Sequence, residues 1–310
     1  MVRQVFDREA QTESAHHLFS LSFQSRRPEY IEGRGNDIPR QYYMSILQAI
    51  ILGLIQGITE FLPVSSSGHL IFFPQLFGWS DQGIAFDVMV HVGTLFAVVV
   101  YFRKKIWQIG KSFFSSKSGQ TKERFLAWAI ILSIIPAGLV GYMLDTNSRS
   151  AAVVGWSLIM WGIVLGIADW YAKNKQKQGN SGVSLNHVHW KQVVMMSVAQ
   201  AIALIPGTSR SGITISAGLF AGVSKTAAAE FSFLMSIPII FLAGALKAKE
   251  LITVGIGDTS VLVLGIGALS AALSGFVAIA FMLKLLQTRG FLPFAIYRVI
   301  IGTIILLVLV

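Results

Sequence analysis

Two short clusters of polar residues interrupt apolar stretches, and the first combines a carboxylate, hydroxyls and an imidazole. Gln56 and Glu60 are spaced i, i+4 and so share one face of a helix. A carboxylate there can bind a hard cation, accept a proton or form a structural pair. Ser66 precedes His69 by three residues, which allows the imidazole to accept the serine proton, or the serine to cap a helix.

The second cluster is a glycine-rich turn that contains one guanidinium. Its sequence is Gly207-Thr208-Ser209-Arg210-Ser211-Gly212, at the start of a predicted helix. Backbone amides at a helix N-terminus bind anions, and arginine adds a planar fork that matches phosphate oxygens. The alternative is a structural ion pair between Arg210 and Glu60. Together the two clusters hold a base, a nucleophile, an anion clamp and candidate metal ligands, which is the set that phosphoryl transfer requires.

The elements that position these residues belong to a membrane protein. Hydrophobic residues make up 54 % of the 310 residues and charged residues 13 %, compared with about 25 % charged residues in a soluble domain. A soluble core of this size cannot hide so much apolar surface, so a water-soluble enzyme is excluded. The absence of cysteine excludes disulfides, thiolate catalysis and cysteine-bound zinc. The net charge of +10 indicates loops that touch anionic lipid. The sequence has no basic, aromatic-rich patch of the kind that binds nucleic acid.

Six stretches approach the length of about 20 apolar residues that crosses a bilayer. They cover 86–102, 125–144, 151–172, 226–246, 261–283 and 291–310. In lipid they must be helices, because a helix satisfies its own backbone within one segment. Residues 1–43 hold six basic and six acidic residues without a long apolar run. We therefore expect a disordered N-terminal tail or an added extension, followed by a membrane domain over 44–310.

The polar clusters break two further apolar regions, 45–78 and 192–222. Proline and glycine at each break, and second limbs that are too short to cross, predict two re-entrant helical hairpins with polar tips. The two regions look like copies. An offset of 144 residues places Gln56 on Gln200, Ser65 on Ser209, Ser67 on Ser211 and Gly68 on Gly212.

Charge placement gives the two hairpins opposite orientations. Loops 103–124, 173–191 and 284–290 hold 13 basic residues, and the alternate loops hold three. Because basic residues concentrate in cytoplasmic loops, the first set is cytoplasmic. Threading six spans through this assignment makes the first hairpin enter from outside and the second from the cytoplasm. Two similar units of opposite orientation form an inverted repeat, whose paired broken helices meet at a site near the midplane.

Four other polar residues receive structural interpretations. Asp87 is expected to cap a span and His91 to pack between helices. Glu230 lies one turn into a span, where Lys225 is a candidate partner. Lys247 is expected to meet lipid headgroups.

The clusters resemble the signatures of a known family. The run Gly57-Ile58-Thr59-Glu60-Phe61-Leu62-Pro63-Val64-Ser65-Ser66-Ser67-Gly68-His69 is similar to the first signature of the bacterial undecaprenyl-diphosphate phosphatases, the bacitracin resistance family. The run Pro206-Gly207-Thr208-Ser209-Arg210-Ser211-Gly212 is similar to the second. The resemblance covers about 44–310. It implies an all-α, polytopic membrane hydrolase with six transmembrane helices and two re-entrant hairpins in an inverted repeat. The implied reaction converts undecaprenyl diphosphate to undecaprenyl phosphate and inorganic phosphate, which recycles the cell-wall carrier lipid and confers bacitracin resistance.

The resemblance also implies roles for individual residues. Ser66 would be the nucleophile, His69 its proton partner and Arg210 the diphosphate clamp. The substrate pocket would be lined by small residues of both tips, namely Ser65, Ser67, Gly207, Thr208, Ser209 and Ser211. Glu60 and Gln56 would hold a divalent cation, Mg²⁺ or Ca²⁺; many family members carry Glu at the position of Gln56, so Glu60 supplies most of the charge here. Direct attack by water, with Glu60 or His69 as base, is an open alternative to attack by Ser66.

A membrane transporter or flippase for a lipid phosphate or another anion is the alternative function, because inverted repeats with broken helices are common in carriers. A carrier needs an anion clamp but no nucleophile beside a base, so Ser66 with His69 favours the hydrolase. The expected partners are the isoprenoid diphosphate lipid and the bilayer of the bacterial inner membrane. Nucleic acid is not expected, and a homodimer is left open.

Overall fold

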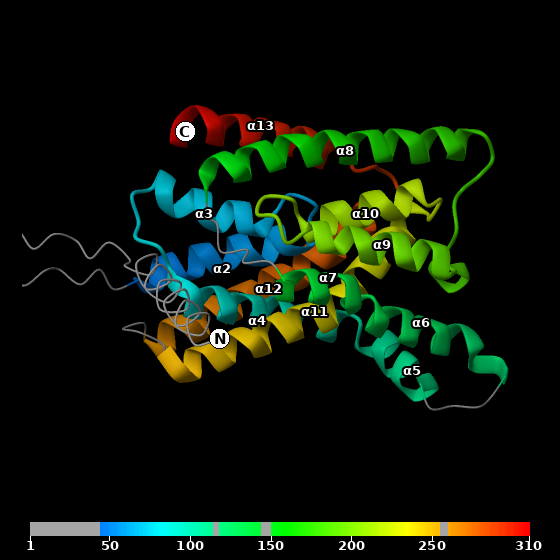
Figure 1. Ribbon diagram of the computed structural model, residues 1–310, viewed down its shortest axis with the longest axis horizontal. Helices are drawn as coiled ribbons and strands as arrows, with labels where there is room; N and C mark the ends of the chain where they lie inside the picture. The colour runs from blue at the N-terminus through cyan, green and yellow to red at the C-terminus, as the bar shows by residue number, and fades with distance from the viewer. Residues whose placement is uncertain (1–43, 114–117, 144–149, 255–259) are drawn as a thin grey trace, which may run out of the picture. The chain divides into compact units, whose positions relative to one another are not determined.

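A computed structural model describes residues 44–113, 118–143, 150–254 and 260–310 (Figure 1). The predicted tail, 1–43, lies outside the described residues. Within them the chain forms helices and loops, with one isolated β-bridge between Val183 and Val223. The longer helices are α2 (Ile46–Phe61), α3 (Ser66–Leu76), α4 (Gly83–Tyr101), α5 (Arg103–Phe113), α6 (Thr121–Leu132), α7 (Ile134–Met143), α8 (Ala151–Lys177), α9 (Trp190–Ile202), α10 (Arg210–Phe220), α11 (Lys225–Val254), α12 (Val261–Leu285) and α13 (Leu292–Leu309).

Six helical segments among the described residues are long and apolar enough to cross a membrane, and they coincide with the six predicted spans. Five are single helices: α4, α8, α11, α12 and α13. The remaining one, predicted over 125–144, covers Thr121–Met143 and is divided between α6 and α7 at Ser133. Pro136 explains the division, because it has no N–H for the Leu132 carbonyl and its ring crowds that carbonyl. The all-α, six-span prediction is confirmed.

Two local expectations differ from the structure. The basic segment 103–124, treated as a loop, contains α5 and the start of α6. The suggested pair of Lys225 with Glu230 is wrong. Glu230 instead pairs with Lys105 at 2.9 Å, and Lys225 pairs with Asp169 of α8 at 2.8 Å. In both pairs the lysine reaches a carboxylate on another helix, a contact that sequence proximity does not predict.

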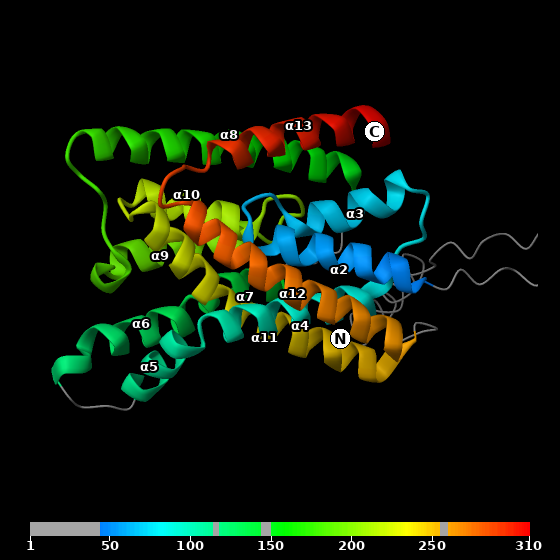
Figure 2. The ribbon, with the colours of Figure 1, turned by 180° about the vertical axis from the view of Figure 1, so that it is seen from behind.

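Both predicted breaks are turns between two packed helices, α2 with α3 and α9 with α10. In each turn the serine that precedes the second helix has a left-handed backbone: φ is 75° at Ser65 and 69° at Ser209. Residues other than glycine rarely adopt this conformation, which costs of order 1–3 kcal/mol. The two turns lie beside each other at the centre of the helices in both ribbon views (Figures 1 and 2).

The serine side chains compensate for part of this cost by capping their helices in the same way. Oγ of Ser65 accepts a hydrogen bond from the N–H of Gly68 at 3.4 Å, and Oγ of Ser209 accepts one from the N–H of Gly212 at 3.1 Å. These amides would otherwise lack partners at a helix start. The shared geometry at an offset of 144 residues supports the predicted repeat; the membrane depth of the two turns stays a prediction.

Close helix packing fixes α2 in place. α12 packs against both α2 and α4, as Figure 2 shows. A side chain at Gly57 of α2 would collide with the carbonyl of Ala271 and with Ser274, and one at Gly93 of α4 with the carbonyl of Ala268. Small residues at these contacts let the backbones approach each other, as is typical of membrane helices. The position of the last turn of α2 is therefore set by α12.

Replacing Gly57 by alanine should destabilise the protein, although alanine is favoured over glycine in a helix by about 1 kcal/mol. Overpacking against Ala271 costs about 1–3 kcal/mol and outweighs that gain. Thermal unfolding in detergent, monitored by tryptophan fluorescence, should show a lower midpoint for Gly57→Ala than for the wild type. Gly110→Ala in α5 is the matched control, because nothing lies within 4 Å of its added methyl. A midpoint for Gly57→Ala at or above that of the control would contradict this packing.

Candidate active site

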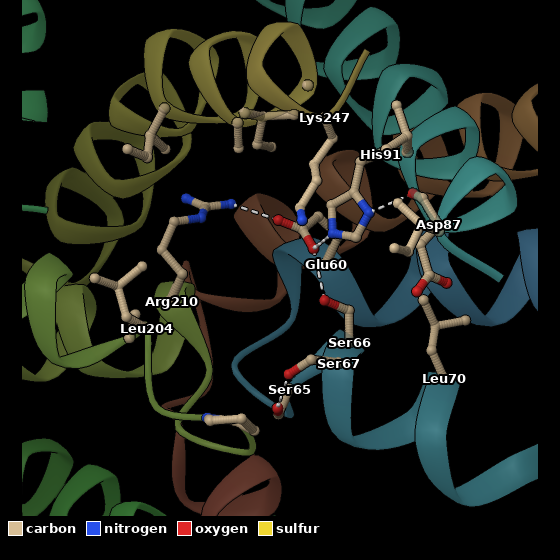
Figure 3. Close-up of a pocket in the computed structure, with 18 of the residues that line it drawn as sticks. Glu60, Ser65, Ser66, Ser67, Leu70, Asp87, His91, Leu204, Arg210 and Lys247 are labelled. Carbon is tan, nitrogen blue, oxygen red and sulfur yellow. Dashed lines mark hydrogen bonds and ion pairs between the residues drawn. The ribbon is translucent and has the colours of Figure 1, made fainter. Parts of the chain in front are cut away.

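Glu60, in the last turn of α2, is buried and connects the two broken helix pairs (Figure 3). Its Oε1 accepts a hydrogen bond from Nη2 of Arg210 at 3.0 Å. Its Oε2 accepts one from Oγ of Ser66 at 2.6 Å and one from Nε2 of Gln56 at 3.1 Å. The Ser66 bond has the short length of a hydroxyl donating to a carboxylate. One carboxylate thus holds a hydroxyl and a guanidinium from opposite repeats.

Arg210 begins α10 and contacts two helices at once. Besides its bond to Glu60, it donates from Nη1 to the main-chain carbonyl of Ser232 in α11 at 3.0 Å. The side chains of Arg210 and Glu60 are only 13 % and 7 % exposed, so the pair is largely removed from water. The ion pair considered from the sequence is therefore present. Its two-point geometry fixes the plane of the guanidinium, which a lysine cannot reproduce.

A cavity of about 750 Å³ opens beside this pair. Its polar end is built by residues of both tips: Glu60, Ser65, Ser66, Ser67, Ser209 and Arg210. Its apolar walls include Leu70, Ile71, Ile84, Val88, Leu204, Ile239 and Ile240. The N-termini of α3 and α10, which carry partial positive charge, meet at the polar end. The cavity therefore suits an anionic group attached to an apolar chain.

Four of the predicted site residues lie behind this surface. Gln56 is buried against Glu60, and Gly207 is pressed against Val154 of α8. Oγ of Ser211 donates to the carbonyl of Leu62 at 3.1 Å, which joins one tip to the other. The buried hydroxyl of Thr208 has no hydrogen-bond partner among the described residues.

His69 points away from Ser66. Its Nδ1 lies 2.7 Å from the carbonyl oxygen of Ser65, and its Nε2 lies 2.8 Å from the hydroxyl of Tyr297 in α13. The ring is 2 % exposed and stacks on Tyr297. Within the described part of the chain, the hydroxyl of Ser66 has its hydrogen bond with Glu60 and none with His69. Glu60 is thus the group placed to take the Ser66 proton.

His91 and Lys247 also line the cavity, although the sequence favoured structural roles for them. Nδ1 of His91 lies 2.7 Å from the carbonyl oxygen of Asp87, and its Nε2 lies 3.8 Å from Oε2 of Glu60. Lys247 extends from α11 toward the same carboxylate (Figure 3). The i, i+4 spacing of Asp87 and His91 was a signal that both share one face of α4. Lys247 gave no such signal, because only the packing of α11 brings it to the cavity.

Several known proteins are similar to this sequence over most of its length. The family described as "Bacitracin resistance protein BacA" matches residues 49–304. The chain belongs to the bacitracin resistance protein family. "Undecaprenyl-diphosphatase 1" of Pseudoalteromonas translucida is 48 % identical over 267 residues, which cover 84 % of this chain and 97 % of the relative. "Undecaprenyl-diphosphatase" of Marinobacter nauticus is 46 % identical over 275 residues, covering 86 % and 100 %. "Undecaprenyl-diphosphatase 2" of Stutzerimonas stutzeri is 44 % identical over 271 residues, covering 85 % and 98 %.

Membership of the bacitracin resistance protein family confirms the resemblance seen in the two signatures. The matched region contains both turns and every residue placed at the cavity. The polar cluster around Glu60 therefore lies within the family domain rather than in the preceding 1–43 segment.

The predicted cation ligands, Glu60 and Gln56, lie side by side in this bacitracin resistance family protein. The buried Oε1 of Gln56 has no hydrogen-bond partner in the described residues and can serve as an acceptor. Those residues contain no group of three or more histidines or acids that could hold a metal ion. A hard divalent cation takes about six or more oxygens. Glu60 lines the cavity, whereas Gln56 lies behind it and turns its amide nitrogen to Glu60. Of the two predicted ligands, Glu60 is therefore the one placed to share an ion with a bound phosphate.

Neutralising Glu60 alone should destabilise this protein more than removing both partners of the ion pair. Glu60→Gln leaves the guanidinium of Arg210 buried without its counter-charge, at a cost of about 3–5 kcal/mol. Glu60→Gln combined with Arg210→Met removes that charge and should recover most of the loss. A double-mutant cycle compares the melting midpoints of the wild type, both single variants and the double variant, and gives the coupling between Glu60 and Arg210. Additive changes would show that the two groups are not coupled.

Proposed function

We propose that this protein hydrolyses undecaprenyl diphosphate to undecaprenyl phosphate and inorganic phosphate in the bacterial plasma membrane, which recycles the carrier lipid of cell-wall synthesis. One observation carries the proposal: the hydroxyl of Ser66 donates at 2.6 Å to Glu60, whose other oxygen holds Arg210. Nucleophile, base and anion clamp are the parts that phosphoryl transfer needs. Relatives named undecaprenyl-diphosphatase are 43–48 % identical to this chain over at least 96 % of their own length.

The cavity accommodates both ends of such a substrate. The diphosphate binds at the polar end, where the amides that begin α3 and α10 and the guanidinium of Arg210 favour phosphate oxygens. The first isoprene units lie along apolar side chains such as Ile71, Ile84 and Ile240. The rest of the tail stays in lipid, so only the head group has to leave its membrane environment.

Glu60 accepts the proton of Ser66 as Oγ of Ser66 attacks the terminal phosphorus. The bond from that phosphorus to the bridging oxygen breaks, and undecaprenyl phosphate leaves with the bridging oxygen. Water then attacks the phosphorus of the phosphoserine. Glu60 returns its proton to Oγ as that bond breaks, and dihydrogen phosphate leaves. The participation of His69, whose ring nitrogens already face Ser65 and Tyr297, stays a prediction that this route does not require.

The cavity opens on the outer side of the membrane in this proposal. Its lining includes Asp81, Gln82 and Gly83 at the start of α4. The other end of α4 leads into the basic run Arg103-Lys104-Lys105, which the charge rule assigns to the cytoplasm. The substrate is therefore hydrolysed at the outer leaflet.

A divalent cation, Mg²⁺ or Ca²⁺, is proposed to accompany the diphosphate. Glu60 would hold it together with phosphate oxygens, and Gln56 would add its Oε1 after rotation of the amide whose Nε2 donates to Glu60 in this structure. Such an ion supplies neutralisation of charge on the phosphate oxygens. A homodimer also stays a prediction.

Release of inorganic phosphate by the purified protein tests the function. The protein in detergent, with undecaprenyl diphosphate and no membrane gradient, should release phosphate; an anion carrier or flippase would release none. The same assay with a chelator, then with Mg²⁺ or Ca²⁺ restored, measures the cation requirement. Equal activity in the presence of the chelator would remove the cation from the proposal.

Ser66→Ala should reduce kcat at least about 10³-fold, because it removes the nucleophile. Rapid quenching of the wild type with substrate labelled in the terminal phosphate should trap labelled phosphoserine at Ser66. Ser67→Ala is the matched control, since Ser67 lines the same cavity and its hydroxyl lies 3.3 Å from Oγ of Ser65; a fall of less than about tenfold is expected. Full activity of Ser66→Ala would assign the attack to water.

Arg210→Lys should remove about 2–4 kcal/mol of transition-state stabilisation. This loss corresponds to a fall in kcat/KM of about 30- to 1,000-fold. A lysine keeps the charge but loses the fork that contacts Glu60 and Ser232 together. Steady-state kinetics with the folded variant measure the effect. Activity near that of the wild type would show that Arg210 does not bind the reacting phosphate.

A further inference from the structure

Arg298, in the membrane-spanning helix α13, is completely buried and has the largest side chain among the fully buried residues of the described chain. A cationic side chain in such a position is expensive and generally has a function. The ion pairs found among the described residues do not include Arg298. Its charge is instead accommodated by main-chain oxygens, which points to a role in holding backbone.

The guanidinium of Arg298 connects the two turns directly. Its Nη1 donates to the carbonyl of Pro63, in the turn between α2 and α3, at 3.3 Å. Its Nη2 donates to the carbonyls of Gly207 and Thr208, in the turn between α9 and α10, at 3.1 and 2.8 Å. Its Nε lies 3.4 Å from the carbonyl of Leu158 in α8. The carbonyls of Pro63, Gly207 and Thr208 belong to turns and would be left unpaired in a buried place without it, whereas that of Leu158 lies within α8.

The packing around Arg298 is built to admit the guanidinium. A Cβ atom at Gly212 of α10 would fall 2.6 Å from Nη1 of Arg298. A Cβ at Gly162 of α8 would fall 3.0 Å from Cβ of Arg298. Glycine at both positions leaves the space that the arginine fills. The hydrogen bonds of Arg298 therefore depend on the close packing of α8, α10 and α13 as well as on the rotamer of the arginine.

We propose that Arg298 is a positioning residue that sets the separation of Ser66 and Arg210. Pro63 lies three residues before Ser66, and Thr208 lies two residues before Arg210, so each carbonyl that Arg298 holds is close to one reacting group. A planar fork reaches both turns at once, whereas the single nitrogen of a lysine cannot. Misplacement of reacting groups by about 1 Å can cost about 10²-fold in rate. The proposal rests on the proposed phosphatase function.

The kinetic test compares Arg298→Lys with Lys225→Met. The lysine variant should lower kcat about 100-fold per folded molecule and change KM less than about threefold, because Arg210 still binds the diphosphate while Ser66 is misaligned. Lys225→Met breaks the pair with Asp169, which is largely buried and does not touch the turns; it should lower the melting midpoint without lowering kcat. Gly212→Ala, which displaces Arg298 without changing it, should reproduce the loss of kcat and serves if Arg298→Lys does not fold.

A second measurement reports the position of the turns without relying on activity. The chain has no cysteine, so Val64→Cys places a single thiol beside Pro63, at a site that is 4 % exposed. Maleimide labelling of this thiol should be slow, and at least about tenfold faster when Arg298→Lys is added, but unchanged by Lys225→Met. An inactive wild type would overturn the phosphatase proposal, while the labelling rates still decide the role of Arg298. Unchanged labelling together with unchanged kcat in Arg298→Lys would overturn the positioning role.

Discussion

The site depends on a carboxylate that is buried in a membrane protein and neutralised by a residue 150 positions away. An ionised Glu60 on an isolated α2 would be prohibitively costly in an apolar surrounding. Arg210 offsets that cost only if the start of α10 reaches the end of α2. The ion pair therefore requires the two turns to lie together, and the packing of α12 on α2 and the contacts of Arg298 with both turns hold them in that arrangement.

Buried helix ends create a second demand, since each leaves several backbone groups without partners. The chain meets it with side chains. Ser65 and Ser209 cap their own helices, Ser211 bonds to the carbonyl of Leu62, and Arg298 takes carbonyls of both turns. The unfavourable backbone at the two serines persists because these contacts over-determine it. The same contacts that satisfy the backbone thus also aim Ser66 and Arg210 at the cavity.

Features that depend on residues close together in the sequence could be predicted, whereas contacts between distant residues could not. Apolar length predicted the spans, because the bilayer sets it residue by residue. The shared offset of Ser65 and Ser209 predicted two similar breaks, and the structure adds that both serines cap a helix. Pro136 carried a local signal for the break at Ser133. The partners of buried groups carry no local signal: His69 meets Tyr297 across 228 residues, and Arg298 meets Pro63 across 235. Spacing in a motif placed His69 near Ser66 in sequence, but the turn of α3 directs the imidazole toward α13.

The repeat explains how two similar backbones form one asymmetric site. An offset of 144 residues takes Ser66 to Arg210, and each is the first residue of a helix that follows a left-handed serine. Under the proposed mechanism, serine at both positions would remove the guanidinium that clamps the phosphate, and arginine at both would remove the nucleophile and add a second buried charge. The same offset takes Glu60 to Leu204, and both line the cavity. The first repeat thus has a carboxylate, Glu60, before Ser66, whereas the second has an apolar residue, Leu204, before Arg210. The backbone symmetry brings the two turns together, and its loss in the side chains creates the chemistry.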